Sequence, residues 1–321
     1  MSGMSLTYID FLVSGVLAAI MFGVGLSINL NDLREIWRSP KAFFYGLFAQ
    51  MVLLPVIAIL FTFFTDLPPA IKTGFIILAA CPGGTTSGLV NVFFRGNVAL
   101  SVALTTVNSI LTLFTIPLLV NLGLTIYFGR HSVFQLPFLE TFLQIFFITL
   151  LPAAIGVFVR FRWDSLAEKI QKPVRNTLII LFAGVYLLVT FSDKSKGGSG
   201  IMLREALQIF PYALLINGAG FAVGLLMGKA GKTGLRSAFT MGIEVALQNT
   251  TLALLVAGTL IRDNEMVKPA LVYALFSFWT ALLYGVIVKK YNKAKLFGEF
   301  NDERERGSVF EPSSAKVSVD S

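Results

Sequence analysis

The chain has 321 residues, of which 55% are hydrophobic and only 14% charged, and its mean hydropathy is +0.76. A soluble protein of this length needs a charged surface that this sequence lacks. Its one cysteine, Cys81, excludes an internal disulfide and any metal site built from cysteines. The composition therefore predicts an all-α polytopic membrane protein.

Apolar segments follow one another along the chain, each long enough to cross a hydrocarbon core of about 30 Å as a helix. We expect nine spans, followed from residue 298 by a polar tail that is too poor in apolar surface to fold. Residues 1–297 then form a single transmembrane unit, and residues 298–321 form a disordered cytoplasmic tail. The expected spans are residues 8–29, 41–64, 70–94, 97–127, 137–161, 174–192, 204–228, 234–260 and 266–288.

The basic residues are distributed unevenly between the two sides of this arrangement. The loops after the odd-numbered spans and the C-terminal tail carry most of the 26 Lys and Arg residues. We expect the protein to lie in the cell (inner) membrane. The positive-inside rule then places its N-terminus outside the cell and its C-terminus in the cytoplasm. Topology thus explains the net charge of +8, and we expect no nucleic-acid partner.

The third span contains the sequence AACPGGTTSGLV (79–90), which should interrupt its helix. Pro82 lacks a backbone N–H group, and the two glycines after it tolerate non-helical angles. The hydroxyl residues Thr85, Thr86 and Ser87 are expected to cap a second half-helix. Unpaired backbone groups are tolerated at membrane depth only inside protein or beside a water-filled cavity, so the break predicts a site.

The eighth span has a second polar interruption, at Glu244, Gln248 and Asn249. Glu244 is the one acid expected deep in a span, where an ionised carboxylate costs about 2.5–3.5 kcal/mol or more. Because we expect no Lys or Arg at comparable depth, Glu244 must be protonated or hold a cation. Two interrupted helices in the two halves of one chain are typical of an inverted-repeat secondary transporter.

Side chains with oxygen atoms accompany both interruptions. Ser101, Thr105 and Asn108 share one face of the fourth span, and Gln50 stands among apolar neighbours in the second. Hard cations prefer such carboxylate, amide and hydroxyl ligands. Elsewhere, the glycines at 220, 224 and 228 repeat every four residues, which predicts a helix-packing face.

The sequences CPGGTTSGLVNVFFRGNVALSVALTT (81–106) and IEVALQNTTLA (243–253) resemble the bile acid:sodium symporter family, and the resemblance covers nearly the whole chain. It implies a panel domain and a core domain in which two broken helices cross. The core would be built around residues 70–127 and 204–260, in a nine-span member of the family.

The resemblance also implies site residues, with sodium ions as the coupling cargo. Substrate would be met at Thr85, Thr86 and Asn249. A first sodium site would use Ser87, Ser101, Thr105 and Glu244, and a second would use Gln50, Glu244 and Gln248 with the backbone carbonyls of Val245 and Leu247.

One position departs from the family pattern. The family usually has asparagine after the serine of the first sodium site, and this chain has Gly88. We therefore expect a first site that binds sodium loosely. Asn91, roughly one turn further along the span, is a candidate substitute, although three residues could carry it too far toward the cytoplasmic end.

The leading hypothesis is a sodium-coupled symporter that imports a small or bile-acid-like organic anion by alternating access, and not an enzyme. Its other partner is membrane lipid, and no pattern indicates an oligomeric state. Two alternatives stay open: a proton-coupled exchanger that uses Glu244, and a membrane receptor that binds a ligand without transporting it.

Overall fold

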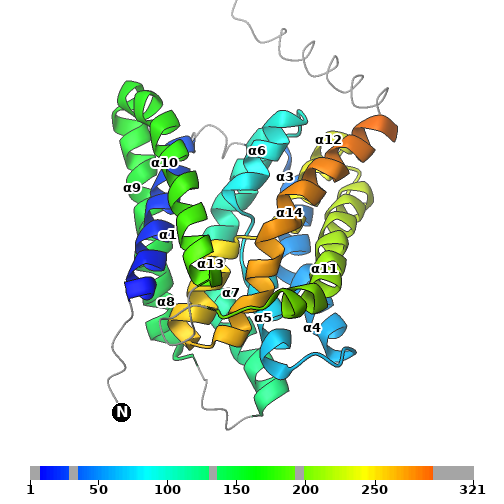
Figure 1. The fold of residues 1–321 in the computed structure, drawn as a ribbon. Helices are drawn as coiled ribbons and strands as arrows, with labels where there is room; N and C mark the ends of the chain where they lie inside the picture. The colour runs from blue at the N-terminus through cyan, green and yellow to red at the C-terminus, as the bar shows by residue number, and fades with distance from the viewer. Residues whose placement is uncertain (1–7, 29–34, 130–135, 192–198, 292–321) are drawn as a thin grey trace, which may run out of the picture.

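The computed structural model describes residues 8–28, 35–129, 136–191 and 199–291, and these form helices joined by short connections (Figure 1). Residue 2, His131 and the predicted tail 298–321 lie outside the described residues. In chain order the helices, with π-helical segments labelled η, are α1 (Tyr8–Ser27), α2 (Glu35–Arg38), α3 (Pro40–Phe48), η2 (Ala49–Leu53), α4 (Leu54–Phe63), α5 (Pro69–Ala80), α6 (Thr85–Phe93), α7 (Val98–Phe128), α8 (Phe138–Ile145), η3 (Phe146–Leu150), α9 (Leu151–Arg162), α10 (Asp164–Phe191), α11 (Leu203–Ala230), α12 (Leu235–Ala246), α13 (Thr250–Leu254), η5 (Leu255–Ile261) and α14 (Asn264–Tyr291).

Five helical stretches of the described chain are long and apolar enough to cross a membrane. Shorter apolar helices cover Phe11–Ser27, Pro69–Ala80 and Thr250–Ile261, and the last two adjoin the predicted interruptions. The all-helical membrane class is thus supported, while the number of spans remains a prediction. The five long stretches are Pro40–Phe63, Val98–Phe128, Phe138–Arg162, Leu203–Ala230 and Asn264–Lys290.

Helix α10 begins ten residues before the span expected at 174–192. Its first turns are charged, and Arg160 at the end of α9 pairs with Asp164 at 2.9 Å and with Glu168 at 3.6 Å. These ion pairs and the helix-compatible spacing of the charges let the helix extend beyond its apolar part. Hydropathy located only the apolar part.

The helix from α3 to α4 contains a π-helical segment, η2, at Gln50. Pro55 follows within about a turn, and its missing N–H group disturbs the regular hydrogen-bond ladder of the preceding turn. π-helical segments within α-helices occur frequently at functional sites. The distortion presents the Gln50 side chain, which is 1% exposed, to the protein interior.

The helices associate in two groups (Figure 1). Helices α1, α9 and α10 pack on one another, and α5, α7, α11, α12 and α14 pack around the interrupted segments. Glycines allow the closest approach in the first group, because a Cβ atom on Gly25 would lie 2.1 Å from the Ala153 carbonyl oxygen. A Cβ atom on Gly156 would likewise lie 2.3 Å from the Phe22 oxygen.

The predicted glycine face of α11 is confirmed. Helix α11 packs along α12, and a Cβ atom on Gly224 would lie 2.4 Å from the Met241 carbonyl oxygen. Cβ atoms on Gly220 and Gly228 would lie 2.8 Å and 2.4 Å from the α carbons of Ala246 and Ala238. The stripe holds α12 close to α11 up to the point where α12 ends.

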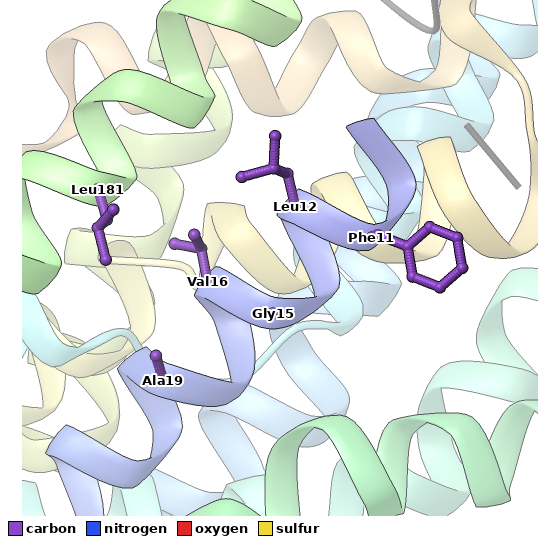
Figure 2. Close-up of a pocket in the computed structure, with 6 residues that line it drawn as sticks. All are labelled: Phe11, Leu12, Gly15, Val16, Ala19 and Leu181. Carbon is purple, nitrogen blue, oxygen red and sulfur yellow. The ribbon is translucent and has the colours of Figure 1, made fainter. Parts of the chain in front are cut away.

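An apolar groove of about 440 Å³ lies between α1 and α10 (Figure 2). It contains no ionisable or amide side chain, and none of its residues belongs to the predicted site. The groove is a surface feature separate from the interrupted helices. Its lining consists of Phe11, Leu12, Gly15, Val16, Ala19 and Leu181.

Candidate functional site

The two interruptions meet each other. The chain leaves α5 at Cys81 and enters α6 at Thr85, and it leaves α12 at Leu247 and enters α13 at Thr250. Between them Gly83 and Gln248 form an isolated antiparallel β-bridge. The Gly84 N–H group donates to the Leu247 carbonyl at 3.0 Å, and the Asn249 N–H group donates to the Pro82 carbonyl at 2.8 Å. Each unwound segment thereby satisfies backbone groups of the other.

Glu244 lies at the end of α12 beside this bridge and is 1% exposed. The Ser101 hydroxyl donates to Glu244 Oε1, and the Thr105 hydroxyl donates to Oε2 at 2.8 Å. A Cβ atom on Gly83 would lie 2.6 Å from Oε2, so the glycine lets the first interruption approach the carboxylate. Three of the residues implied for the first sodium site, Ser101, Thr105 and Glu244, are in direct contact.

Ser87 is the fourth residue implied for the first site. It is fully buried in α6, and its hydroxyl donates to the Gly84 carbonyl at 2.7 Å. Gly88 follows it, and apart from its chain neighbours and the backbone of its own helix no atom lies within 4 Å of the place where its Cβ atom would stand. The residue that departs from the family pattern thus borders open space.

The residues implied for the second sodium site also meet. Gln50 Nε2 donates to Gln248 Oε1 and to the Cys81 carbonyl, both at 3.0 Å. Gln248 Nε2 donates to the Val245 carbonyl at 2.5 Å, and Leu247 receives the bond from Gly84 described above. Residues from η2, the first interruption and the second interruption therefore converge beside Glu244.

The residues expected to meet substrate stand at the starts of the two half-helices. Asn249 is the N-cap of α13, and its side-chain oxygen accepts the Leu252 N–H group at 3.0 Å. Thr86 is exposed on α6, and the Thr85 side chain lies outside the described part. The expected hydroxyl caps of α6 were wrong: the N-cap residue is Gly84, with no side-chain bond to the helix. The extended backbone of the bridge occupies the N-cap position instead.

One basic side chain of the described structure is as fully buried as Glu244, although it lies near the start of its helix and not deep in a span. Lys268, in the second turn of α14, is 1% exposed. Its ammonium group pairs with Glu205 at 3.0 Å and with Glu265 at 2.7 Å, at the ends where α11 and α14 begin. Lys268 is thus neutralised by its own two carboxylates. Among the described residues, no Lys or Arg pairs with Glu244.

Several buried polar atoms near the site lack a hydrogen-bond partner in the described structure. Gln50 Oε1 and Asn91 Oδ1 are two of them, and both amide atoms of Asn108 are unpaired although the residue is 1% exposed. A buried polar atom without a partner costs about 1–3 kcal/mol. Amide oxygens are among the ligands that hard cations prefer.

Sequence reasoning missed a polar network behind the second interruption. The Tyr273 hydroxyl donates to the Ala246 carbonyl, and Asn217 Nδ2 donates to the same carbonyl at 3.1 Å and to the Tyr273 oxygen at 2.9 Å. Thr280 donates to Asn217 Oδ1 at 2.7 Å. This network holds the last residue of α12. Asn217 is an amide in the middle of an apolar span, which was the available signal.

Comparison with known proteins identifies the class and the family. The long apolar helices and the buried site at two interruptions define an all-α integral membrane protein. A model of the Sodium Bile acid symporter family matches residues 15–196. The chain therefore belongs to the sodium bile acid symporter family, so it is a transporter and not an enzyme.

Individual relatives agree with this assignment. The chain is 30% identical over 287 residues to an uncharacterized sodium-dependent transporter, YocS, of Bacillus subtilis, covering 89% of this chain and 85% of that protein. It is 30% identical to the probable sodium/metabolite cotransporter BASS1 of Arabidopsis thaliana over 75% of this chain and 57% of that protein. It is 24% identical to the human ileal sodium/bile acid cotransporter over 94% of this chain and 86% of that protein.

Proposed function

We propose that this protein imports a small organic anion together with sodium ions by alternating access. The observation that carries the proposal is the contact between the two interruptions, with one buried carboxylate beside it. Relatives named for sodium-dependent transport of metabolites, bile acids and organic anions support the same class of cargo.

Glu244 is proposed as the ligand shared by two sodium sites. Hydroxyl oxygens of Ser101 and Thr105 already contact its two carboxylate oxygens, and Ser87 completes the first site. Gln50 and Gln248 form the second site with the carbonyls of Val245 and Leu247. Oxygen donors around one carboxylate suit a hard monovalent cation, whereas transition metals favour imidazole and thiolate.

An anionic substrate is favoured by the half-helix starts. Helices α6 and α13 both begin at the crossing, and helix N-termini carry partial positive charge and free N–H groups. The Asn249 oxygen is engaged in capping α13, which leaves the N–H groups of its amide to meet an anion. Thr85, Thr86 and Asn249 are therefore proposed to bind the substrate carboxylate.

The two helix groups fit the proposed mechanism. We assign α1, α8, α9 and α10 to a panel domain and the helices around the interruptions to a core domain that carries the site. The core combines residues around 70–127 with residues around 204–260, as an inverted repeat requires.

Sodium coupling provides enough energy for concentrative uptake. If two sodium ions accompany one monovalent anion, one net positive charge enters per cycle and contributes about 2.3 kcal/mol per 100 mV of membrane potential. Each tenfold sodium gradient adds about 1.4 kcal/mol per ion. The remaining variable is the number of occupied sodium sites.

Uptake into sealed vesicles tests the proposal, with sodium replaced by potassium at constant pH and candidate anions supplied as labelled substrates. Accumulation that requires a sodium gradient supports it. Accumulation driven by a pH gradient without sodium would instead indicate a proton-coupled exchanger. Saturable binding without accumulation would indicate a receptor.

A further inference from the structure

Asn91 lies on α6 within reach of the first sodium site. It is fully buried, one turn after Ser87. Its Nδ2 atom donates to the Ser87 carbonyl at 3.0 Å and to the Ser101 hydroxyl oxygen at 3.3 Å. Ser101 in turn donates to Glu244. The concern that Asn91 lies too far toward the helix end is thus removed, because its amide touches a residue of the site.

The other edge of the same amide is unpaired. Asn91 Oδ1 is buried without a hydrogen-bond partner in the described structure. It lies 2.4 Å from the place where a Cβ atom on Gly96 would stand, and Thr240 Oγ1 lies 2.7 Å from the same place. The amide therefore directs its N–H groups toward the oxygen-rich site and its oxygen toward Gly96 and Thr240.

A half-turn of this amide exchanges the two edges at almost no change in shape, since its oxygen and nitrogen are nearly isosteric. The oxygen would then face Ser87 and Ser101, and the N–H groups would face the Thr240 hydroxyl oxygen, which already accepts the Asn97 N–H group at 2.8 Å. In the turned position the amide oxygen faces the Ser87 carbonyl oxygen, and the two oxygens repel each other when no cation is present. A bound cation attracts both oxygens and makes the turned position favourable. The described orientation of the amide therefore suits an empty sodium site, and the turned orientation suits a site that holds sodium.

Position 88 offers the first site no side-chain oxygen in this chain. A Cβ atom on Gly88 would have no neighbour within 4 Å, so a longer side chain has room there. Gly88 and Asn91 are three residues apart on the same helix, about one turn. Positions 88 and 91 therefore lie on the same face of α6.

We propose that Asn91 supplies the side-chain amide oxygen of the first sodium site, by turning its amide when sodium binds. The inference rests on the proposed function, because it assumes that sodium binds beside Glu244. It assigns to this chain a sodium ligand at a position other than the one the family pattern implies.

Equilibrium binding of radioactive sodium to the purified full chain, in potassium at constant ionic strength, tests the inference. We expect Asn91→Ala to weaken sodium binding at one site at least about tenfold. Asn91→Asp removes the N–H donors but keeps an oxygen, so it should bind sodium as tightly as the wild type or more tightly. Gly88→Asn combined with Asn91→Ala should restore affinity to within about threefold. Ser109→Ala, whose hydroxyl bonds only the Thr105 carbonyl of its own helix, is the control.

Each result has one meaning. If Asn91 only positions Ser101 through its N–H group, Asn91→Asp fails like Asn91→Ala and the double variant is not rescued, which overturns the inference. Wild-type affinity in Asn91→Ala also overturns it. If Asn91→Ala does not fold, Asn91→Asp decides the question by itself: sodium affinity at or above that of the wild type supports the inference, and weaker binding overturns it. A wild-type chain that binds no sodium in excess potassium overturns the proposed function itself.

Discussion

A Cβ atom added to Gly83 would stand 2.6 Å from Oε2 of Glu244, too close for any real contact. The two residues belong to different halves of the chain, and the bridge between Gly83 and Gln248 holds them together. The glycine of the CPGG sequence is therefore required for the approach of the two interruptions, in addition to the freedom that it gives the backbone.

Gly83→Ala should abolish or strongly reduce sodium-driven uptake, by at least about tenfold, because the methyl group displaces the carboxylate or separates the two segments. Uptake in vesicles with equal amounts of protein measures the effect. Gly218→Ala is a matched control, because a Cβ atom on Gly218 has no neighbour within 4 Å. Equal uptake by the two variants would contradict the close approach.

Glu244→Gln tests the carboxylate with little change of shape. Losing the charge that the two proposed sodium sites share should lower sodium-driven uptake at least tenfold, equivalent to about 1.4 kcal/mol or more. The exposed Glu140 on α8 provides the control substitution, Glu140→Gln, which should leave uptake unchanged. If Glu244→Gln transports normally, its carboxylate has no part in the mechanism.

The proposed second sodium site can be weakened separately from the proposed first site. Gln248→Ala and Gln50→Ala each remove an amide that the structure places in contact with the other at 3.0 Å. We expect both to raise the sodium concentration for half-maximal uptake and to reduce the steepness of sodium activation, while saturating sodium restores most of the rate. Unchanged steepness in both variants would leave one sodium ion per anion.

Sequence patterns located both interruptions because each involves residues that are costly in a membrane helix. Pro82 and Glu244 mark them, and the structure has the helices ending at Ala80 and Ala246. Residue type alone also selected Gln50, whose burial and contact with Gln248 then followed. These signals are local, so one sequence was sufficient.

Contacts between distant elements could not be read in the same way. The burial of Lys268 depends on carboxylates from both α11 and α14. The hydroxyls after Gly84 looked like caps, but a backbone bridge to the other half of the chain decides that helix start. The burial of a side chain and the start of a half-helix here depend on contacts between distant segments. Residue spacing within one segment does not reveal these contacts.

The membrane orientation is tested by labelling cysteines from outside intact cells. The described part of α1 begins at the end of the molecule opposite to the end of α11, where Lys232 lies (Figure 1). Ser2→Cys should be modified by an impermeant reagent, and Lys232→Cys should be modified only after the membrane is opened. The native Cys81 is fully buried and serves as the unlabelled background. The reverse labelling pattern would contradict the predicted orientation.

Tyr273→Phe tests whether the network behind α12 supports the proposed second sodium site. The hydroxyl donates to the Ala246 carbonyl and accepts from Asn217, so its removal leaves a buried amide without one partner and costs about 1–3 kcal/mol. Ala246 lies between Val245 and Leu247, whose carbonyls are proposed sodium ligands. We therefore expect a lower unfolding temperature together with weaker sodium binding, by about two- to fivefold, and unchanged substrate selectivity.

Tyr127→Phe is the matched control, because its hydroxyl bonds Thr62 at 2.8 Å, away from the interruptions. A loss of stability without any change in sodium affinity would show that the network only holds the helices together, and equal sodium weakening in Tyr127→Phe would show that the effect is not specific to α12.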